Sequence, residues 1–234
     1  MTAPMKQLLL PFPEKPPLAL ADFFPGRNGE LLAALEALLE PNPRECFLTL
    51  WGPPGCGKTH LLQGLVAEGR DRGLRAGYFS PDRVASAFAD GPWDLAAVDD
   101  AQHLDAAGQI EWMALYQLQR EAGGRLAMAL DVPPRQAGLR PDLATRLAGG
   151  LLYQVHGLEE EEKAQALKER AAGLGIALSD EVIRYCLRHA PRDLSSLAAL
   201  VGALDRRSLE THRAVTLPLL REVMAAQDGP ERHR

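Results

Sequence analysis

The chain has 234 residues, with 31 acidic side chains, 26 basic ones and a net charge of −5. Its content of 46% hydrophobic and 24% charged residues is typical of a globular protein and argues against disorder. The acidic balance and the 6% aromatic content speak against a chain that holds nucleic acid through its own electrostatic surface. Three cysteines far apart in the sequence predict neither a disulfide framework nor a metal site, and favour a reducing, cytoplasmic location.

Residues 1–20 form the first segment. They include five prolines and have neither helical nor alternating periodicity, so we predict an extended arm. The apolar run at residues 8–12 is interrupted by Pro11 and is too short for a secretion signal or a membrane span. We therefore expect no membrane association.

Short apolar runs alternate with longer segments between residues 21 and 157. Strands are predicted at residues 46–51, 75–80, 94–98, 125–130 and 151–155, with helices such as 58–72 and 108–121 between them. Apolar strands that alternate with helices are typical of βαβ units, which form a parallel sheet covered on both faces. The sequence thus predicts an α/β domain over residues 21–157.

Residues 158–234 have only helical patterns. The first helix, at residues 159–172, begins with four acidic residues, which are favourable near the positive end of a helix dipole. Ser179 is a candidate N-cap for the second helix. Apolar residues at positions 194, 197, 198, 201 and 204 form one stripe of a third helix, and a fourth is expected near 218–226. We therefore predict a small helical domain over residues 158–234.

A phosphate-binding loop follows the first predicted strand. The pattern is Gly, four residues, Gly, Lys and Thr, and its members are Gly52, Pro53, Pro54, Gly55, Cys56, Gly57, Lys58 and Thr59. Its glycines let backbone N–H groups face phosphate oxygens, Lys58 neutralises the β and γ oxygens, and Thr59 offers a hydroxyl to Mg²⁺. The loop lies between a predicted strand and a predicted helix, which is the context the motif needs. The alternative is a glycine-rich turn without a ligand.

Acidic side chains end the third and fourth predicted strands. Asp99 is the candidate Mg²⁺ ligand, and Asp100 is the candidate that orients a water for attack on the γ-phosphate. Asp131 ends the fourth strand, where it could sense the γ-phosphate or cap the turn before Pro133. The guanine-reading motif Asn-Lys-x-Asp does not occur in the sequence, so adenine is the predicted base.

These motifs together resemble the AAA+ ATPases and, among them, the DnaA-related proteins, which include the initiator DnaA and its shorter relative Hda. The resemblance covers nearly the whole chain and implies an AAA+ P-loop core with a five-stranded parallel sheet, followed by a helical lid. Residues 22–28 are similar to the family's opening segment beside the adenine, which implies roles for Phe24 and Gly26 in binding the cofactor. His60 belongs to the family's phosphate-loop exit.

The resemblance implies functional roles for two arginines. Residues 141–147 are similar to the segment that carries the arginine finger, which maps onto Arg146 and implies action on the nucleotide of a neighbouring subunit. Residues 191–194 resemble the lid motif called sensor two, which implies that Arg192 lies near the β and γ phosphates. For both arginines the alternative is an ordinary surface charge.

The arm also carries a candidate partner-binding peptide. Its residues resemble the peptide by which Hda and other replication proteins dock on the sliding clamp, the β subunit of DNA polymerase III; they are Gln7, Leu8, Leu10, Pro11 and Phe12. A glutamine amide takes specific hydrogen bonds, apolar side chains fill a cleft, and proline lowers the ordering cost. The alternative is an arm that packs on its own domain.

The resemblance implies a clamp-associated regulator that holds ADP or ATP with Mg²⁺ and stimulates hydrolysis of DnaA-bound ATP, thereby repressing re-initiation of replication. Residues 81–93 are too short for the helical insertion by which DnaA grips single-stranded DNA, and the chain ends just beyond the lid, so we expect DNA contact only through the clamp. A helicase-loader-type ATPase and a non-catalytic, nucleotide-switched adaptor on the clamp stay open as alternatives. Intrinsic ATPase activity and assembly with further copies of the chain also stay open.

Overall fold

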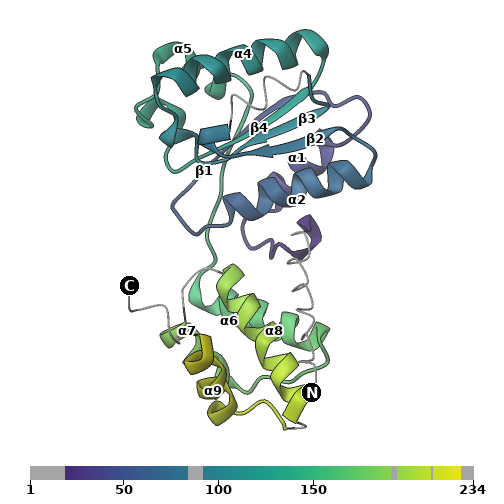
Figure 1. Ribbon diagram of the computed structural model, residues 1–234, viewed down its shortest axis with the longest axis vertical. Coiled ribbons are helices and arrows are strands. Elements are labelled where there is room, and N and C mark those ends of the chain that lie inside the picture. Colours follow the sequence, from purple (N-terminus) through teal and green to yellow (C-terminus); the bar gives the residue numbers. More distant parts are fainter. Residues whose placement is uncertain (1–18, 84–91, 191–193, 212, 228–234) are drawn as a thin grey trace, which may run out of the picture.

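The computed structural model describes residues 19–83, 92–190, 194–211 and 213–227, which form an α/β core and a helical lid (Figure 1). Within these residues, five parallel strands make one sheet in the order β2-β3-β4-β1-β5. The strands are β1 (Phe47–Trp51), β2 (Ala76–Phe79), β3 (Leu95–Val98), β4 (Arg125–Leu130) and β5 (Leu151–Gln154). The predicted parallel sheet is confirmed, with each strand within one residue of its expected ends.

Helices cover both faces of the sheet because the strand residues alternate between two apolar cores. In β3, Leu95 and Ala97 join the core under α1 and α2, whereas Ala96 and Val98 join the core under α4 and α5. Figure 1 shows these pairs of helices on opposite faces of the sheet. Their bounds are α1 (Gly29–Leu38), α2 (Lys58–Asp71), α4 (Ala106–Ala122) and α5 (Pro141–Ala148).

Short 3-10 turns lead into or out of the core elements. They are η1 (Leu20–Asp22), η2 (Pro81–Arg83), η3 (Ala101–His103) and η4 (Pro134–Gln136). The turns η3 and η4 follow the carboxyl ends of β3 and β4, where the chain must leave the sheet. This edge of the sheet is therefore built from tight turns, and ligands of open α/β sheets bind at this edge.

The lid helices pack around an apolar cluster of their own, which includes Leu167, Ile183, Val201 and Leu220. The first two helices begin at side-chain caps: Glu159 and Glu162 form a capping box, and the Ser179 hydroxyl accepts from the Val182 N–H at 3.3 Å. The predicted helical lid and the Ser179 cap are confirmed. The lid helices are α6 (Glu160–Gly173), α7 (Asp180–His189), α8 (Leu194–Thr211) and α9 (Leu217–Gln227).

The chain passes from β5 into the lid beside the opening segment, residues 22–28. The Asn28 side chain is buried and pairs with the backbone of His156: its Nδ2 donates to the His156 carbonyl at 2.9 Å, and its Oδ1 accepts from the His156 N–H at 2.8 Å. Ion pairs continue the contact, with Arg170 at 3.1 Å from Asp22 and Arg27 at 3.5 Å from Glu159. The opening segment thus contacts both the core and the lid.

In the part of the chain that the structure describes, no helix is long and apolar enough to cross a membrane.

Candidate functional site

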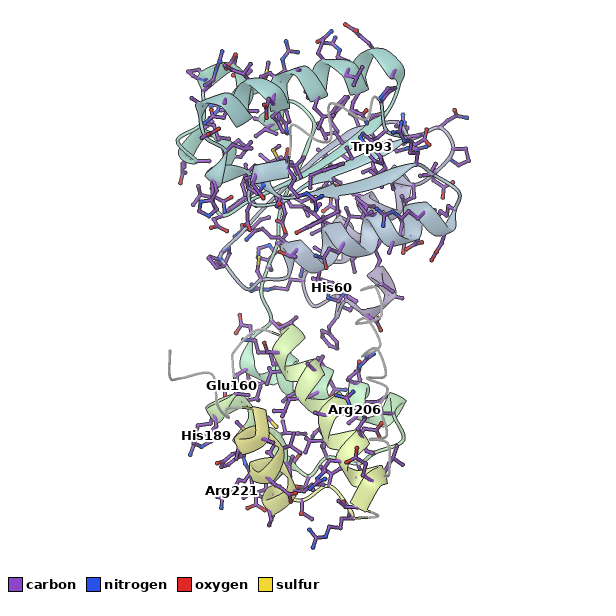
Figure 2. All side chains as sticks on the ribbon, viewed as in Figure 1. His60, Trp93, Glu160, His189, Arg206 and Arg221 are labelled. Carbon is purple, nitrogen blue, oxygen red and sulfur yellow. The ribbon has the colours of Figure 1, made fainter. Side chains whose placement is uncertain are left out.

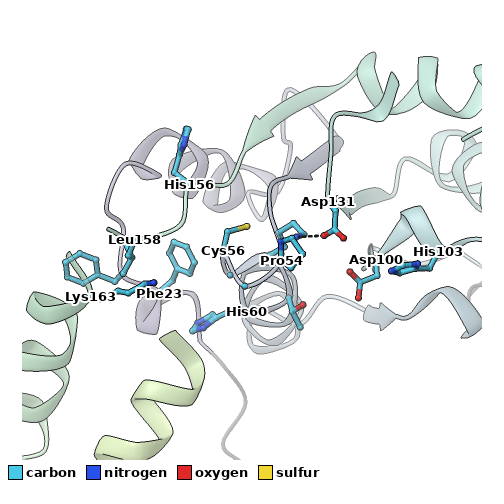
Figure 3. Close-up of a pocket in the computed structure, with 15 residues that line it drawn as sticks. Phe23, Pro54, Cys56, His60, Asp100, His103, Asp131, His156, Leu158 and Lys163 are labelled. Atoms are coloured by element: carbon cyan, nitrogen blue, oxygen red, sulfur yellow. Dashed lines mark hydrogen bonds and ion pairs between the residues drawn. The ribbon is translucent and has the colours of Figure 1, made fainter. Parts of the chain in front are cut away.

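A cavity of about 530 Å³ lies at the carboxyl ends of β1, β3 and β4, and the lid supplies part of its wall. This volume is in the range of sites for small molecules and cofactors. Figure 3 shows the side chains that surround it. The lining consists of Phe23, Phe24, Pro54, Gly55, Cys56, Gly57, Lys58, Thr59, His60, Asp100, His103, Asp131, His156, Leu158 and Lys163.

The phosphate loop supplies one continuous wall, residues 54–60, and its glycines are required by geometry. Gly57 has a φ of +104°, and a Cβ atom there would lie 2.7 Å from Cε2 of Phe23. At Gly52 a Cβ atom would lie 2.6 Å from the carbonyl oxygen of Val155. These positions therefore need glycine for a left-handed backbone and for close packing. Helix α2 begins directly after the loop, which directs its N-terminus at the cavity and favours an anion there.

Lys58 is the charged side chain of the loop, and it is buried, with 5% of its surface exposed. Its Nζ donates to the carbonyls of Gly52 at 2.8 Å and Pro53 at 3.3 Å, and to Asp131 Oδ1 at 2.9 Å. The first two residues of the loop, Gly52 and Pro53, thus hold its lysine through their carbonyl groups. The Lys58–Asp131 ion pair, drawn as a dashed line in Figure 3, joins the predicted phosphate lysine to the predicted fourth-strand sensor.

The acidic end of β3 divides into a buried and an open carboxylate. Asp99 is 2% exposed and lies behind the cavity lining: its Oδ1 accepts from the Asp100 N–H at 2.9 Å, and its Oδ2 accepts from the Tyr78 hydroxyl at 2.8 Å. Burial, with the nearby charge of Asp99, raises the pKa of Tyr78 above its ordinary value, so Tyr78 remains a donor at neutral pH.

Asp100 faces the cavity from a strained backbone. Its φ of +47° lies in the left-handed region, which few residues other than glycine adopt and which is often found at functional sites. The side chain accepts from Gln102 Nε2 at 3.2 Å. This geometry turns the second carboxylate toward the solvent-filled side of the site while the first stays buried.

The end of the cavity nearest the lid is more apolar. The rings of Phe23 and His60 meet edge to face, with centroids 5.6 Å apart, and His60 points from α2 toward the lid (Figure 2). Phe24 lines this end, as the position of the opening segment predicts. Gly26 is not among the lining residues, although a Cβ atom there would lie 2.8 Å from Cδ2 of the lining residue Leu158.

Phe23 of the opening segment was not among the predicted site residues, and neither were the lining residues His103, His156, Leu158 and Lys163. His103 follows the acidic pair within η3, so its position after the β3 end was a usable signal. His156, Leu158 and Lys163 lie on the connection to the lid or on α6, and only the placement of the lid brings them to the cavity (Figure 3).

Comparisons with known proteins agree on the relationship. A family model described as the lid domain of Hda matches residues 160–224. A solved DNA replication initiation factor is 26% identical, covers 85% of this chain and 68% of its own, and has a TM-score of 0.67. The lid thus matches the Hda family model, and the chain as a whole is similar to the DnaA-related AAA+ proteins.

Other solved structures share the fold at lower identity. AMPPCP-bound DnaA from Aquifex aeolicus is 24% identical over 92% of this chain and 71% of its own, with a TM-score of 0.70. Domain III of the Thermotoga maritima replication initiation protein DnaA is 21% identical over 94% of this chain and 100% of its own, with a TM-score of 0.72. The α/β AAA+ fold predicted from the motifs is confirmed.

Arg146 lies outside the cavity, on α5. Its guanidinium is 5.2 Å from the ring centroid of Tyr116 on α4, beside Leu147 and Phe47. This chain therefore does not bring its expected arginine finger to its own site. Arg192 and the arm residues Gln7, Leu8, Leu10, Pro11 and Phe12 lie outside the described residues.

The donor set fits Mg²⁺ rather than a protein-caged metal. Among the described residues, no group of three or more His, Cys, Asp or Glu side chains could hold a metal ion. Mg²⁺ in AAA+ and other P-loop proteins needs few protein ligands, because waters and nucleotide phosphates complete its octahedron. The hydroxyl of Thr59 and the carboxylates that end β3 are the hard oxygen donors that this ion prefers.

Proposed function

We propose that the cavity binds ADP or ATP together with Mg²⁺. The observation that carries this proposal is Lys58, a buried ammonium held at the cavity by its own phosphate loop and by Asp131. A buried cation is costly unless it is paired, so its retention beneath a loop of N–H donors supports a site built for phosphates. The AMPPCP-bound relative supports an adenine nucleotide as the ligand.

Each side chain has a distinct task in this proposal. Loop N–H groups and Lys58 bind the phosphates, Thr59 and Asp99 hold Mg²⁺, and Phe23 and Phe24 form the wall beside the base. Bound Mg²⁺ would neutralise charge on the β and γ oxygens. Asp100, which faces the cavity, would orient water, although its side chain is one methylene shorter than the Glu usual there. For Gly26, His60 and Arg192 the proposal carries over the nucleotide-binding roles that the family resemblance implies.

We infer that the biological role is regulation of the initiator DnaA. The Hda-type lid supports a regulator rather than a helicase loader. In this role the arm docks on the sliding clamp and the chain packs against ATP-bound DnaA, so that Arg146 contacts the nucleotide of its neighbour. The position of Arg146 on the α4 and α5 face, away from its own cavity, supports action in trans. DNA would be reached only through the clamp.

The role is tested by measuring hydrolysis of DnaA-bound ATP in the presence of clamp-loaded DNA. We expect the full chain to accelerate hydrolysis, and Arg146→Ala to lose the acceleration, because an arginine finger contributes about 10³- to 10⁵-fold in rate. Arg140→Ala is the matched control, since Arg140 is an exposed arginine at the start of the same helix and pairs with Asp142. Equal rates with and without the chain would refute the role. Unchanged hydrolysis with intact clamp binding would favour the non-catalytic adaptor.

A further inference from the structure

Tyr78 lies on β2, at the edge of the sheet, and its hydroxyl meets the site through Asp99. Its hydroxyl donates to Asp99 Oδ2 at 2.8 Å, and the Asp100 N–H occupies the other oxygen at 2.9 Å. Each carboxylate oxygen accepts in two lone-pair directions. The hydrogen bonds therefore use one direction on each oxygen, fix the rotation of the carboxylate and leave the remaining directions available.

The contact extends to the helix that follows the phosphate loop. The Gln63 side chain is close enough to Tyr78 to act on its pKa, and Gln63 lies four residues after Thr59 on α2. Residues four apart share one face of a helix, so Thr59 and Gln63 lie on the same side of α2. The Tyr78 hydroxyl thus joins the acidic end of β3 to the face of the helix that carries the Thr59 hydroxyl.

We propose that Tyr78 is a positioning residue for Mg²⁺, which acts by fixing the orientation of the Asp99 carboxylate. The proposal rests on the nucleotide and Mg²⁺ site proposed above and adds to it a residue that never contacts the ligand. A carboxylate that is 2% exposed has lost most of its water, so a hydroxyl donor both stabilises its charge and restricts its motion. Partners of this kind change metal affinity by about 10- to 100-fold when they are removed.

Tyr78→Phe removes the hydroxyl and keeps the ring, which packs against the core under α1 and α2. Tyr153→Phe is the matched control, because Tyr153 packs against the same core from β5, at the opposite edge of the sheet, and bonds Glu30 instead. The affinity for ADP is measured by calorimetry in saturating Mg²⁺ and in EDTA. We expect Tyr78→Phe to reduce the Mg²⁺-dependent gain in ADP affinity by about tenfold or more and to leave the affinity in EDTA unchanged.

A double-mutant cycle separates positioning from simple packing. In an Asp99→Asn background, which removes the charge that Tyr78 orients, Tyr78→Phe should have no further effect on the Mg²⁺-dependent gain. Equal weakening with Mg²⁺ and with EDTA, or an unchanged gain, would overturn the role of Tyr78 while leaving the nucleotide site in place. A wild-type chain that binds ADP equally well with and without Mg²⁺ would overturn the proposed Mg²⁺ site and, with it, the role of Tyr78.

Discussion

Lys58 is buried but not isolated, since carbonyls of its own loop and the Asp131 carboxylate accept from its ammonium. Such an arrangement keeps a cation in a poorly hydrated place at low cost and holds it ready to exchange one acceptor for a phosphate oxygen. The same logic explains Asp99, whose buried charge is balanced by the N–H of Asp100 and the hydroxyl of Tyr78. At this scale the site is a set of paired charges.

Removal of the ammonium should abolish most nucleotide binding. Hydrogen bonds to charged groups contribute about 1.5–3 kcal/mol, so Lys58→Ala should weaken ADP and ATP binding by about 10- to 100-fold. Calorimetry at neutral pH measures the effect. Lys168→Ala is the control, because Lys168 is an exposed lysine on α6 that pairs with Asp180 at 2.8 Å. Equal affinities for Lys58→Ala and wild type would rule out the proposed phosphate site.

Gly57 should tolerate no side chain. Gly57→Ala places a Cβ atom 2.7 Å from Phe23 and keeps a φ of +104°, whereas Gly73→Ala meets nothing within 4 Å at a φ of +85°. The left-handed backbone should lower the stability of both variants by about 1–2 kcal/mol. Displacement of the Phe23 ring should lower the stability of Gly57→Ala alone by roughly a further 1–3 kcal/mol. Denaturant unfolding gives both values. Similar decreases in the free energy of unfolding for the two variants would mean that the Phe23 ring moves aside at little cost.

The Asn28 side chain joins the opening segment to the strand that leads into the lid. Asn28 is 2% exposed and satisfies both the N–H and the carbonyl of His156, 128 residues away in the sequence. Buried backbone groups that lose their partners cost free energy, so this joint fixes where the chain leaves the core. Phe23 and Phe24, which line the cavity, belong to the segment that Asn28 anchors.

Asn28→Ala should therefore destabilise the protein by about 2–6 kcal/mol, because two polar groups lose their partners and each costs about 1–3 kcal/mol. Asn28→Asp should recover part of this loss, since a carboxylate still accepts from the His156 N–H although it cannot donate to the carbonyl. Unfolding in urea measures the free energies. Asn42→Ala, at an exposed loop position, is expected to change stability little. Equal stabilities for the Ala variants at positions 28 and 42 would show that the hydrogen bonds between Asn28 and His156 do not stabilise the fold.

In the whole molecule, the described parts of the lid and the core meet at the cavity and through two exposed ion pairs. The ion pairs between Asp22 and Arg170 and between Arg27 and Glu159 are exposed, and exposed pairs contribute at most about 1 kcal/mol each. A ligand that touches Lys58 in the core and Lys163 in the lid would therefore add substantially to the contact between them. Nucleotide binding should stabilise the folded chain, by about 2.7 kcal/mol at 100 times Kd.

The arm should be separable from the nucleotide site. Ala19, the first described residue, contacts the core: its carbonyl lies 3.0 Å from His60 Nε2. Deletion of residues 1–13 ends before this contact, so it should abolish binding to the sliding clamp while ADP affinity stays within about twofold. Surface plasmon resonance on immobilised clamp and calorimetry with ADP measure the two properties. The double variant Gln7→Ala, Phe12→Ala in the full chain tests the same peptide without a truncation. Clamp binding that survives the deletion would favour the helicase-loader alternative.

Sequence alone determined the elements and the local motifs. The strand at residues 46–51 and the helix from Lys58 were predictable because burial on both faces leaves continuous apolar runs and because the phosphate loop has a fixed spacing. The Ser179 cap and the acidic start of α6 follow from the same local chemistry.

Only the tertiary structure decided which distant groups meet. Asp131 reaches Lys58 because β4 lies beside β1, and Tyr78 reaches Asp99 because β2 pairs with β3. Lys163 and Leu158 line the cavity because of where the lid sits, and Gly26 packs against Leu158 without joining the lining. Hydrophobic periodicity records which face of an element is buried but not which element covers it, so these contacts depend on strand order and lid placement.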